Sequence, residues 1–308
     1  MVDMSRRDVI EAPEGFQPGA QGAAANWSGT HAAERTILIT GCSSGIGYES
    51  ALALKNHGGW RVFASCRKQS DCDRLAKEGF ETVRIDLANP ESIASGVDWV
   101  LERTGGKLDA LFNNGAFSTP GAFEDVATEH VRKMFETNFF GWYELTRRVL
   151  PAMRKQGHGR IINCSSVLGF MSVRFMGAYA ASKHAVEGWN DSLRLELAGT
   201  NIHPIILQPG PIKSRMLDNA RAHFLETVDV RNSSFRSEYG RELSKFASGN
   251  RTNSFKLGPE AVAAKVIKAL EDPRPHARYR VTIPTMVGAW LKRLLPTRWL
   301  DKIMLMQR

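Results

Sequence analysis

The sequence predicts an α/β protein with a doubly wound parallel sheet. From Thr36 to Leu207, short apolar segments alternate with longer helical segments, which is the pattern of successive strand–helix–strand units. The apolar segments show no clear polar alternation, as expected for parallel strands buried on both faces. The chain has 308 residues, of which 43% are hydrophobic, so it is long and apolar enough to bury a sizeable core. Right-handed crossovers between such strands give a doubly wound sheet.

The expected elements follow one another with short connections. A glycine-rich turn at Gly41–Gly47 joins the first strand to the first helix, and a long helix before the fifth strand is expected to bend at Pro151, since proline lacks the N–H of a helical hydrogen bond. The predicted strands are Thr36–Thr40, Trp60–Ser65, Thr82–Ile85, Ala110–Asn113, Arg160–Cys164 and Ile202–Leu207. The predicted helices are Tyr48–Asn56, Ser70–Lys77, Pro90–Thr104, Ala127–Arg154 and Ala178–Leu197.

The expected organisation is a single domain with a leader and a C-terminal helical extension. Residues 1–34 contain an Ala-, Gly- and Pro-rich stretch and five acidic residues, which predicts a disordered leader, with partner binding as the alternative. The acidic residues argue against a mitochondrial presequence. Residues 35–284 form the folded domain, and residues 285–308 form a basic amphipathic tail.

Composition and charge exclude several classes of protein. The four cysteines form no CxxC pair, so we expect no disulfide framework, no metal site and a reducing, cytoplasmic setting. No uncharged apolar run reaches the roughly 18 residues of a membrane-spanning helix, and the N-terminus lacks the apolar stretch of a secretory signal. The net charge is +9, but residues 274–308 carry eight Lys or Arg against one Asp. The nearly neutral body does not suit nucleic-acid binding.

The turn between the first strand and the first helix is typical of a dinucleotide-binding site. Gly41 permits the tight turn, Gly45 lets the backbone approach a pyrophosphate, and Gly47 lets the helix pack close to the sheet. The helix N-terminus then offers free N–H groups to the phosphates. The turn residues expected to contact the cofactor are Gly41, Ser43, Ser44, Gly45, Ile46 and Gly47.

The end of the second strand predicts which nucleotide binds. Sites selective for NAD place an acidic residue there to bind the ribose 2′-hydroxyl, but this chain has Arg67 and Lys68. A charge-assisted bond to a 2′-phosphate contributes about 1.5–3 kcal/mol. We therefore expect NADP(H) to be preferred over NAD(H), with Arg67 as the phosphate contact. The alternative is that both bases are simply solvated at the start of a helix.

Several spaced motifs together resemble the short-chain dehydrogenase/reductase family, in its single-domain type. The resemblance covers about residues 36–214 and extends more loosely to 283. It implies a Rossmann-like fold and an NAD(P)-dependent oxidoreductase acting on an alcohol or carbonyl. The motifs are Thr40–Gly47, Asp86, Asn113-Asn114, Asn138, Ser166, Tyr179-x-x-x-Lys183 and Pro209-Gly210.

Four residues are the expected catalytic set. Tyr179 and Lys183 are spaced i and i+4 on one helix and therefore share a face. The Lys183 ammonium and the positive charge of the oxidised nicotinamide are expected to lower the pKa of Tyr179 by about two to three units, so that it acts as general acid and base. Ser166 would hydrogen-bond the substrate oxygen, with Ser165 as the rival. By resemblance, Asn138 holds a water that links Lys183 to solvent.

The resemblance also implies further cofactor contacts. Lys183 and Tyr179 lie at the nicotinamide end, where Lys183 binds the ribose hydroxyls. The other positions are Asp86, Leu87, Asn113, Pro209, Gly210, Ile212 and Ser214. Two departures from the family pattern occur: Gly115-Ala116 reverses the usual Ala-Gly, and Ser214 replaces the usual threonine while keeping its hydroxyl.

Residues 212–257 fall where the family's substrate-covering segment lies. Its apolar side chains predict either a hydrophobic pocket or ordinary core packing: Met216, Leu217, Phe224, Leu225, Phe235, Tyr239 and Phe246. Further apolar wall is expected from Phe117, Leu168, Phe170, Met171, Phe175 and Met176. The motifs look most like the 17β-hydroxysteroid and retinol dehydrogenase branch, which implies a hydrophobic ketone, aldehyde or alcohol as substrate.

The tail has two short amphipathic pieces broken by Pro296. It is expected to pack on the body or on a second subunit, and the alternative is peripheral attachment to an anionic membrane surface. By resemblance, the helices near 127–154 and 178–197 would form the faces of a homo-oligomer, most simply a dimer. Two other functions remain open: a nucleotide-sensing regulatory or scaffold protein without turnover, and a membrane-associated lipid carrier centred on the tail.

Overall fold

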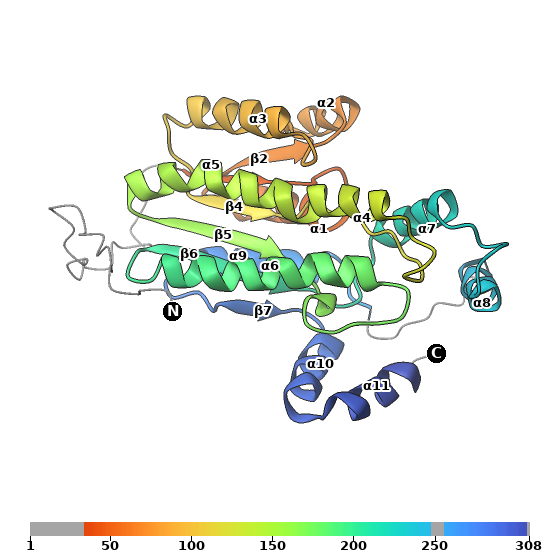
Figure 1. Cartoon of the computed structure of the whole chain (residues 1–308). Coiled ribbons are helices and arrows are strands. Elements are labelled where there is room, and N and C mark those ends of the chain that lie inside the picture. The colour runs from red at the N-terminus through yellow and green to blue at the C-terminus, as the bar shows by residue number, and fades with distance from the viewer. Residues whose placement is uncertain (1–33, 248–255, 307–308) are drawn as a thin grey trace, which may run out of the picture.

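The central feature of the fold is a seven-stranded parallel sheet with the strand order β3-β2-β1-β4-β5-β6-β7 (Figure 1). The computed structural model describes residues 34–247 and 256–306, so residues 1–33 of the predicted leader lie outside it. All six predicted strands occur, shifted by no more than one residue at either end. The strands are β1 Arg35–Ile39, β2 Trp60–Cys66, β3 Glu81–Arg84, β4 Ala110–Asn113, β5 Gly159–Cys164, β6 Ile202–Gln208 and β7 Arg278–Arg280.

Helices cover both faces of the sheet, which confirms the doubly wound α/β class. In Figure 1, α5 and α6 lie in front of the sheet and α1 and α9 lie behind it. The strands are buried along most of their length, and Ile37, Leu38 and Ile39 of β1 are fully inaccessible. The helices are α1 Gly45–His57, α2 Gln69–Lys77, α3 Pro90–Arg103, α4 Thr128–Phe135, α5 Gly141–Gln156, α6 Gly177–Glu196, α7 Met216–Thr227, α8 Arg236–Ala247, α9 Glu260–Glu271, α10 Ile283–Leu294 and α11 Thr297–Met306.

The long helix before β5 is interrupted by a π-helical turn that the sequence analysis did not predict. Its α-helical geometry gives way to a π-helical turn, η1, at Glu136–Phe140, between α4 and α5. Pro151 lies inside α5, and that helix continues to Gln156. The extra residue of a π turn changes which side chains face inward, and such turns often mark functional sites. Here the turn buries Asn138 completely.

Two elements lie in a region to which the sequence analysis assigned no structure. The strand β7 has the sequence Arg-Tyr-Arg, which lacks the apolar run that marks the other strands. Only Tyr279 of this strand is buried, and β7 pairs with β6 through Arg278, Tyr279 and Arg280. The helix α9 packs against α1 on the rear face. This edge of the sheet therefore depends on tertiary pairing rather than on local pattern.

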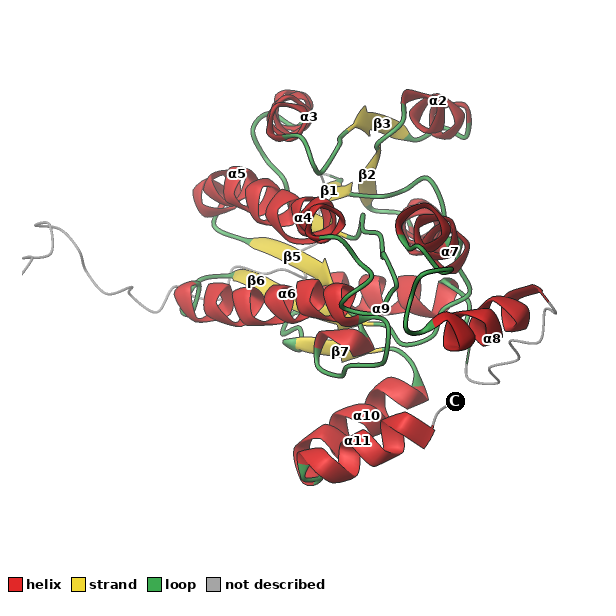
Figure 2. Cartoon of the chain, turned by 45° about the vertical axis from the view of Figure 1, so that its right-hand side comes forward, coloured by secondary structure: helices red, strands yellow, loops and turns green. Residues whose placement is uncertain are grey.

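The segment 212–257 folds partly as expected, with α7 and α8 at one end of the sheet (Figure 2). Phe224 and Tyr239 are buried in a small second core with Ala122 and Val228, and Phe175 packs against it. The Tyr239 hydroxyl accepts a hydrogen bond from Ala122 N at 2.7 Å and donates one to an Asp125 carboxylate oxygen at 2.6 Å. Core packing is therefore the better interpretation for these two aromatics, whereas Leu225 is 53% exposed.

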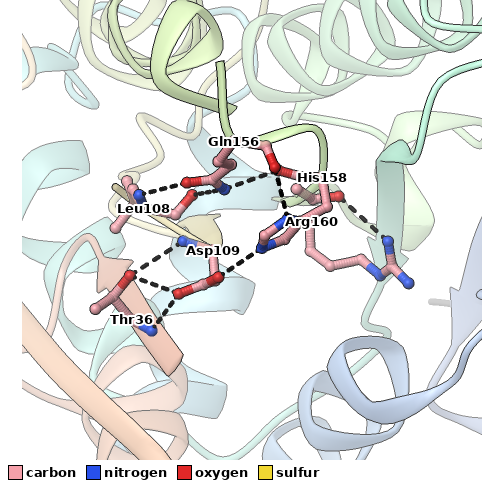
Figure 3. A network of polar contacts seen from close by, with 7 residues as sticks. Thr36, Leu108, Asp109, Gln156, His158 and Arg160 are labelled. Carbon is pink, nitrogen blue, oxygen red and sulfur yellow. Dashed lines mark hydrogen bonds and ion pairs between the residues drawn. The ribbon is translucent and has the colours of Figure 1, made fainter. Parts of the chain in front are cut away.

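A polar network joins the amino ends of three strands (Figure 3). One carboxylate oxygen of Asp109, the residue before β4, accepts hydrogen bonds from Thr36 N at 2.7 Å and Thr36 Oγ1 at 2.8 Å. The other lies 2.8 Å from His158 Nε2, just before β5. Gln156 bridges Leu108 and His158 through their backbones. This network holds β1, β4 and β5 together at their amino ends, on the side of the sheet away from their carboxyl ends.

Candidate active site

The predicted site residues gather at the carboxyl ends of β1, β4, β5 and β6. The strand order reverses between β1 and β4, and ligands of open α/β sheets bind outside the carboxyl ends at such a switch point. Thr40 follows β1 and contacts β4: its Oγ1 accepts hydrogen bonds from Asn114 N at 2.9 Å and Gly115 N at 3.0 Å. These hydrogen bonds therefore join the ends of β1 and β4, the strands on either side of the switch point, next to the glycine turn.

The glycines of the turn are required by close backbone contacts. Gly41 has φ +73°, and a Cβ atom there would lie 2.6 Å from Gly115 Cα. A Cβ atom on Gly47 would collide with the Gly41 carbonyl and lie 2.6 Å from Asn114 Nδ2. Gly115 in turn would place a Cβ atom 2.9 Å from Leu87 Cδ1. The reversed Gly115-Ala116 order therefore puts the glycine where the turn approaches most closely.

The start of α1 is suited to bind phosphate. Gly45 has φ +62°, and a Cβ atom there would lie 3.3 Å from Ser214 Cβ. Ser44 is the N-cap residue of α1, and its side chain makes no capping hydrogen bond. First-turn N–H groups without a side-chain cap are the donors that anions bind. The predicted contacts Ser43 to Gly47 and Ser214 thus lie together, with Ile46 packed against the core.

Three basic side chains lie around the end of β2. Arg67 and Lys68 directly follow the strand and are exposed. Arg74 of α2 was not predicted, because nothing in its spacing links it to the turn. Its Nη2 donates a hydrogen bond to the Ser43 carbonyl oxygen at 2.7 Å, and its Nη1 lies 2.8 Å from Glu78 Oε1. Arg67, Lys68 and Arg74 therefore form a basic cluster next to the glycine turn, which we call the cationic corner.

Tyr179 lies buried near the start of α6, 6% exposed. Burial raises the pKa of its phenol well above the ordinary value; the nearby Cys164 thiol adds to this, and a hydrogen bond with Ser166 opposes it. The expected lowering of this pKa is therefore not found in the protein alone, because desolvation disfavours the phenolate. Ser166 and Tyr179 are nevertheless within hydrogen-bonding reach, as the predicted roles require.

Lys183 is 1% exposed, one helical turn after Tyr179. Its Nζ donates a hydrogen bond to the Cys164 carbonyl oxygen at 2.9 Å and lies 5.7 Å from the centre of the Tyr179 ring. Burial lowers the pKa of Lys183 to about 8, while Cys164 and Glu187 act in the opposite direction. The lysine is thus held beside the tyrosine with a pKa close to neutral pH.

Trp142 is a site residue that the sequence analysis missed. Its ring centre lies 4.2 Å from Lys183 Nζ, a cation–π distance, and its Nε1 donates to the Gly115 carbonyl oxygen at 2.9 Å. The side chain is fully buried. From sequence alone, a tryptophan on an amphipathic helix is interpreted as a core residue, so no local signal marked Trp142 as part of the site.

Asn138 is fully buried in η1, and its amide is occupied by protein groups. Its Oδ1 accepts from Phe117 N at 3.0 Å, and its Nδ2 donates to Phe117 O at 2.9 Å and to Ser182 Oγ at 3.3 Å. Ser182 Oγ donates to the Tyr179 carbonyl oxygen at 2.8 Å. The Asn138 side chain therefore fixes the loop at Phe117 and connects it to α6 through Ser182.

The two adjacent asparagines after β4 have different surroundings. The Asn113 Nδ2 donates to Asn163 Oδ1 at 2.8 Å and to Thr146 Oγ1 at 3.1 Å, so this predicted cofactor residue bonds within the core. The Asn114 Nδ2 instead donates to the Thr40 carbonyl oxygen at 3.0 Å. Asn114 is therefore the asparagine whose side chain contacts the glycine turn.

The remaining predicted contacts lie on neighbouring loops. Asp86 accepts a hydrogen bond from Ala88 N at 3.0 Å, and Leu87 is buried beside Gly141. The Pro209 carbonyl oxygen accepts from Val167 N at 2.8 Å, which ties its loop to the one that carries Ser166. The other residues of this loop are Gly210, which lies against Thr282 and Thr285, and Ile212, which is buried.

The choice between the two serines is informed by their surroundings. Ser165 is 3% exposed, and a Cβ atom on Gly169 would collide with its Oγ and lie 3.0 Å from Glu187 Oε1. It therefore points toward Gly169 and Glu187. Ser166 is less buried and accepts a hydrogen bond from Leu168 N at 3.1 Å. This arrangement favours Ser166 as the serine beside Tyr179.

The loop between Ser166 and α6 carries a strained residue. Phe175 has φ +64°, an unfavourable conformation for a bulky side chain. Its ring packs against Tyr239 at 5.1 Å and Phe235 at 5.4 Å between centroids, and its carbonyl oxygen accepts from Gly121 N. The segment that carries α7 and α8 thus holds the loop that precedes Tyr179.

The residues present fit a nicotinamide dinucleotide. The uncapped helix start and the glycine cradle supply phosphate donors, the bases near β2 supply cations, and the buried Tyr179–Lys183 pair lies on the same edge of the sheet. In the described part of the chain, no group of three or more His, Cys, Asp or Glu side chains is arranged to hold a metal ion.

Comparison with known proteins agrees with this geometry. The family profile described as short chain dehydrogenase matches residues 35–224. An uncharacterized oxidoreductase, YbbO, of Escherichia coli strain K12 is 42% identical over 271 residues, covering 88% of this chain and 94% of that protein. Retinol dehydrogenase 8 of Bos taurus is 32% identical, covering 80% and 81% of the two chains.

A solved structure extends the comparison to a bound cofactor. The F189W variant of actinorhodin polyketide ketoreductase, crystallised with NADPH, is 30% identical to this chain and has a TM-score of 0.67. The similarity covers 82% of this chain and 97% of the ketoreductase. The region matched by the family profile, residues 35–224, includes the turn, Ser166, Tyr179 and Lys183.

Proposed function

The chain belongs to the short-chain dehydrogenase/reductase family and is an NAD(P)-dependent oxidoreductase, and from this premise we propose that it interconverts a hydrophobic ketone or aldehyde and its alcohol with NADP(H). One observation carries the proposal: Tyr179, Ser166 and Lys183 are brought together at the carboxyl edge of the sheet, next to the glycine turn. A scaffold or sensor without turnover has no need to keep this set.

Tyr179 is the proposed general acid and base. In reduction its hydroxyl donates a proton to the substrate oxygen, and in oxidation its phenolate removes that proton. Ser166 holds the substrate oxygen by a hydrogen bond and stabilises the negative charge that develops on it. The nicotinamide of the bound cofactor supplies or accepts the hydride.

Lys183 has two proposed roles. Its ammonium stabilises the Tyr179 phenolate through space, and it binds the ribose hydroxyls at the nicotinamide end. Its pKa of about 8 means that it gains and loses a proton near neutral pH. Trp142 supports the charged form by its cation–π contact. Asn138 fixes η1 against Phe117, and Ser182 connects it to the helix that carries the catalytic pair.

The preference for NADP(H) rests on the cationic corner near β2. No acidic residue follows the strand, and Arg67 and Lys68 are exposed and available to a 2′-phosphate. The test is Arg67→Ser: it should weaken NADPH binding about 10- to 100-fold while leaving NADH binding nearly unchanged. Fluorescence titration with both nucleotides measures this. Equal weakening of both would show that Arg67 does not read the phosphate.

The proposed substrate is hydrophobic. The loop after Ser166 carries the apolar residues Leu168, Phe170 and Met171, of which Met171 is buried. We expect these residues, with Phe117, to line the substrate site. The name of the relative retinol dehydrogenase 8 supports a substrate of this kind. The lipid-carrier alternative predicts ligand binding that survives loss of the nucleotide site.

The decisive experiment follows NADPH and NADH oxidation with ketosteroids, retinal and long-chain aldehydes or ketones. Tyr179→Phe removes only the hydroxyl, so turnover should fall by at least about 100-fold, with NADPH affinity changed less than about tenfold. Turnover at near wild-type rates in this variant would show that another group moves the proton. Binding of nucleotide without any turnover across a wider substrate screen would favour the sensor.

The proposed assembly is a homo-oligomer formed through η1, α5 and α6. Phe140 and Tyr143 are about half exposed there and contact Phe139 and Trp189 in an aromatic cluster.

We place the enzyme in the cytoplasm, because all four cysteines are free thiols and buried, which suits a reducing compartment. No helix in the described part of the chain has the length and apolar character to cross a bilayer.

A further inference from the structure

The last two helices form a separate feature of the surface. α10 and α11 lie side by side and extend away from the sheet beyond β7 (Figures 1 and 2). We call residues 283–306 the C-terminal hairpin. None of the proposed catalytic residues lies in this hairpin.

One side of the hairpin is anchored on the body. Thr285 and Gly288 of α10 are buried. Thr285, together with the preceding Thr282, packs against Gly210, and a methyl group at Gly288 would lie 3.7 Å from Met171 Cγ. Leu300 of α11 is also buried. Through α10, the hairpin therefore packs next to the loop that follows Ser166.

The other side is apolar and exposed. Of the fourteen exposed large hydrophobic side chains in the described residues, eight lie in the hairpin. Trp290 is 66% exposed, Leu294 69% and Trp299 66%. On α10 the exposed apolar residues are spaced by three or four positions and so share one face, opposite Thr285 and Gly288. The eight residues are Ile283, Met286, Val287, Trp290, Leu294, Trp299, Leu305 and Met306.

Basic residues accompany this apolar face. Lys292, Arg293, Arg298 and Lys302 are all exposed, and Asp301 is the acidic residue of the hairpin, so its net charge is +3. Tryptophan suits a boundary between water and hydrocarbon, because its ring is apolar and its N–H is polar. Exposed tryptophan and leucine beside lysine and arginine are the features of helices that lie in a membrane interface.

We propose that the C-terminal hairpin docks on the surface of an anionic lipid bilayer, with its exposed apolar face among the lipid chains and its basic side chains at the headgroups. The charge decides between this occupant and a second copy of the chain. A two-fold pairing would set the same basic patch against itself, and like charges repel across such an interface. Anionic headgroups neutralise the same charges.

The docked orientation has a consequence for the body. The hairpin is anchored on Gly210 and Met171, which lie in the two loops tied together by the Val167–Pro209 hydrogen bond. These loops carry the proposed substrate-binding region. A bilayer bound by the hairpin therefore lies near that region. Hydrophobic molecules are concentrated in the bilayer, so they are held close to the proposed substrate-binding region.

The test is sedimentation of the full-length protein with vesicles of phosphatidylcholine alone or of an equimolar mixture with phosphatidylglycerol. Leu294→Glu should reduce binding to the anionic vesicles about tenfold or more, because it places a charge in the apolar face. The matched control is Leu225→Glu, since Leu225 is 53% exposed but lies on α7, outside both the hairpin and the proposed subunit interface. The control should bind like the wild type. Arg293→Gln tests the charge and should weaken binding, more so at low salt.

Three outcomes would overturn the proposal. The first is that wild-type protein stays in the supernatant with anionic vesicles at low salt. The second is equal loss of binding in Leu294→Glu and Leu225→Glu. The third is a drop in molar mass by light scattering in Leu294→Glu with no vesicle binding by the wild type, which would assign the face to a second copy. None of these readouts depends on turnover, so failure here is distinct from failure of the proposed reaction.

Discussion

Gly47→Ala provides a direct test of the close packing between the glycine turn and the first helix. In most helices this change is favourable, because alanine is preferred over glycine by about 0.8–1 kcal/mol. At Gly47 the added methyl group would collide with the Gly41 carbonyl and lie 2.6 Å from Asn114 Nδ2, whereas ordinary contact begins at 3.4 Å. Both groups are held by the backbone or hydrogen-bonded to it, so neither can rotate away.

The magnitude follows from these distances. To restore ordinary contacts, α1 must separate from the Asn114 side chain by about 0.8 Å, and the Gly41 carbonyl of the turn must move away as well. Overpacking of this kind costs about 1–3 kcal/mol, which exceeds the gain in helix propensity. The same movement displaces the N–H groups proposed to bind phosphate. We expect NADPH affinity to fall at least tenfold, about 1.4 kcal/mol.

The assay combines urea unfolding with NADPH titration, and Gly240→Ala is the matched control. Gly240 is an exposed helical glycine in α8, and a Cβ atom there would meet no described atom within 4 Å outside its own helix. The control should be unchanged or stabilised by up to about 1 kcal/mol, with unchanged NADPH binding. If Gly47→Ala matches the control in both measurements, the close approach of the turn to α1 is not required.

Two further predictions concern charge. Asp109 is partly buried, which raises its pKa, but hydrogen bonds with His158 and Thr36 outweigh this effect and lower the pKa. These hydrogen bonds stabilise the folded protein by about 1–3 kcal/mol. The stabilisation is present above the ordinary carboxyl pKa of about 4 and is lost as pH falls through the lower pKa of the folded state. The stability gap between wild type and Asp109→Asn in urea unfolding should therefore narrow progressively as pH falls below the ordinary carboxyl pKa of about 4, and a pH-independent gap would contradict this. Trp142→Phe weakens the cation–π contact with Lys183 by about 1 kcal/mol, so the pKa of Lys183 should fall by about 0.7 unit. The limb of the pH–rate profile that reports the Lys183 ionisation should move down by the same amount. An unmoved limb would show that Trp142 does not affect the charge of Lys183.

Local pattern was sufficient for most of the fold. Strands such as Ile202–Gln208 are apolar and buried on both faces, and the glycine turn has a fixed geometric use, so each is visible in a short stretch of sequence. The helical spacing of Tyr179 and Lys183 likewise fixes their common face. These features depend on a few neighbouring residues, which is why they were predicted.

What escaped prediction depends on distant contacts. β7 is a strand because β6 offers it an edge, and its own Arg-Tyr-Arg sequence carries no strand signal. The π turn occurs where Asn138 meets the Phe117 backbone, 21 residues away in sequence. Trp142 joins the site because the Gly115 loop and Lys183 lie on either side of it. None of these partners is adjacent in the chain.

The charge state of the buried pair bears on the direction of the reaction. With its pKa raised by burial, Tyr179 stays protonated throughout the neutral range and is ready to donate a proton to a carbonyl oxygen. Oxidation of an alcohol needs the phenolate, which becomes stable only when positive charge lies within about 4–6 Å. Lys183 supplies part of that charge, and with a pKa of about 8 it supplies less as pH rises above that value. In the protein alone, the surroundings of Tyr179 therefore hold the protonated form that the proposed reduction step uses, and the phenolate that the proposed oxidation step uses depends more strongly on the positive charge of the oxidised nicotinamide.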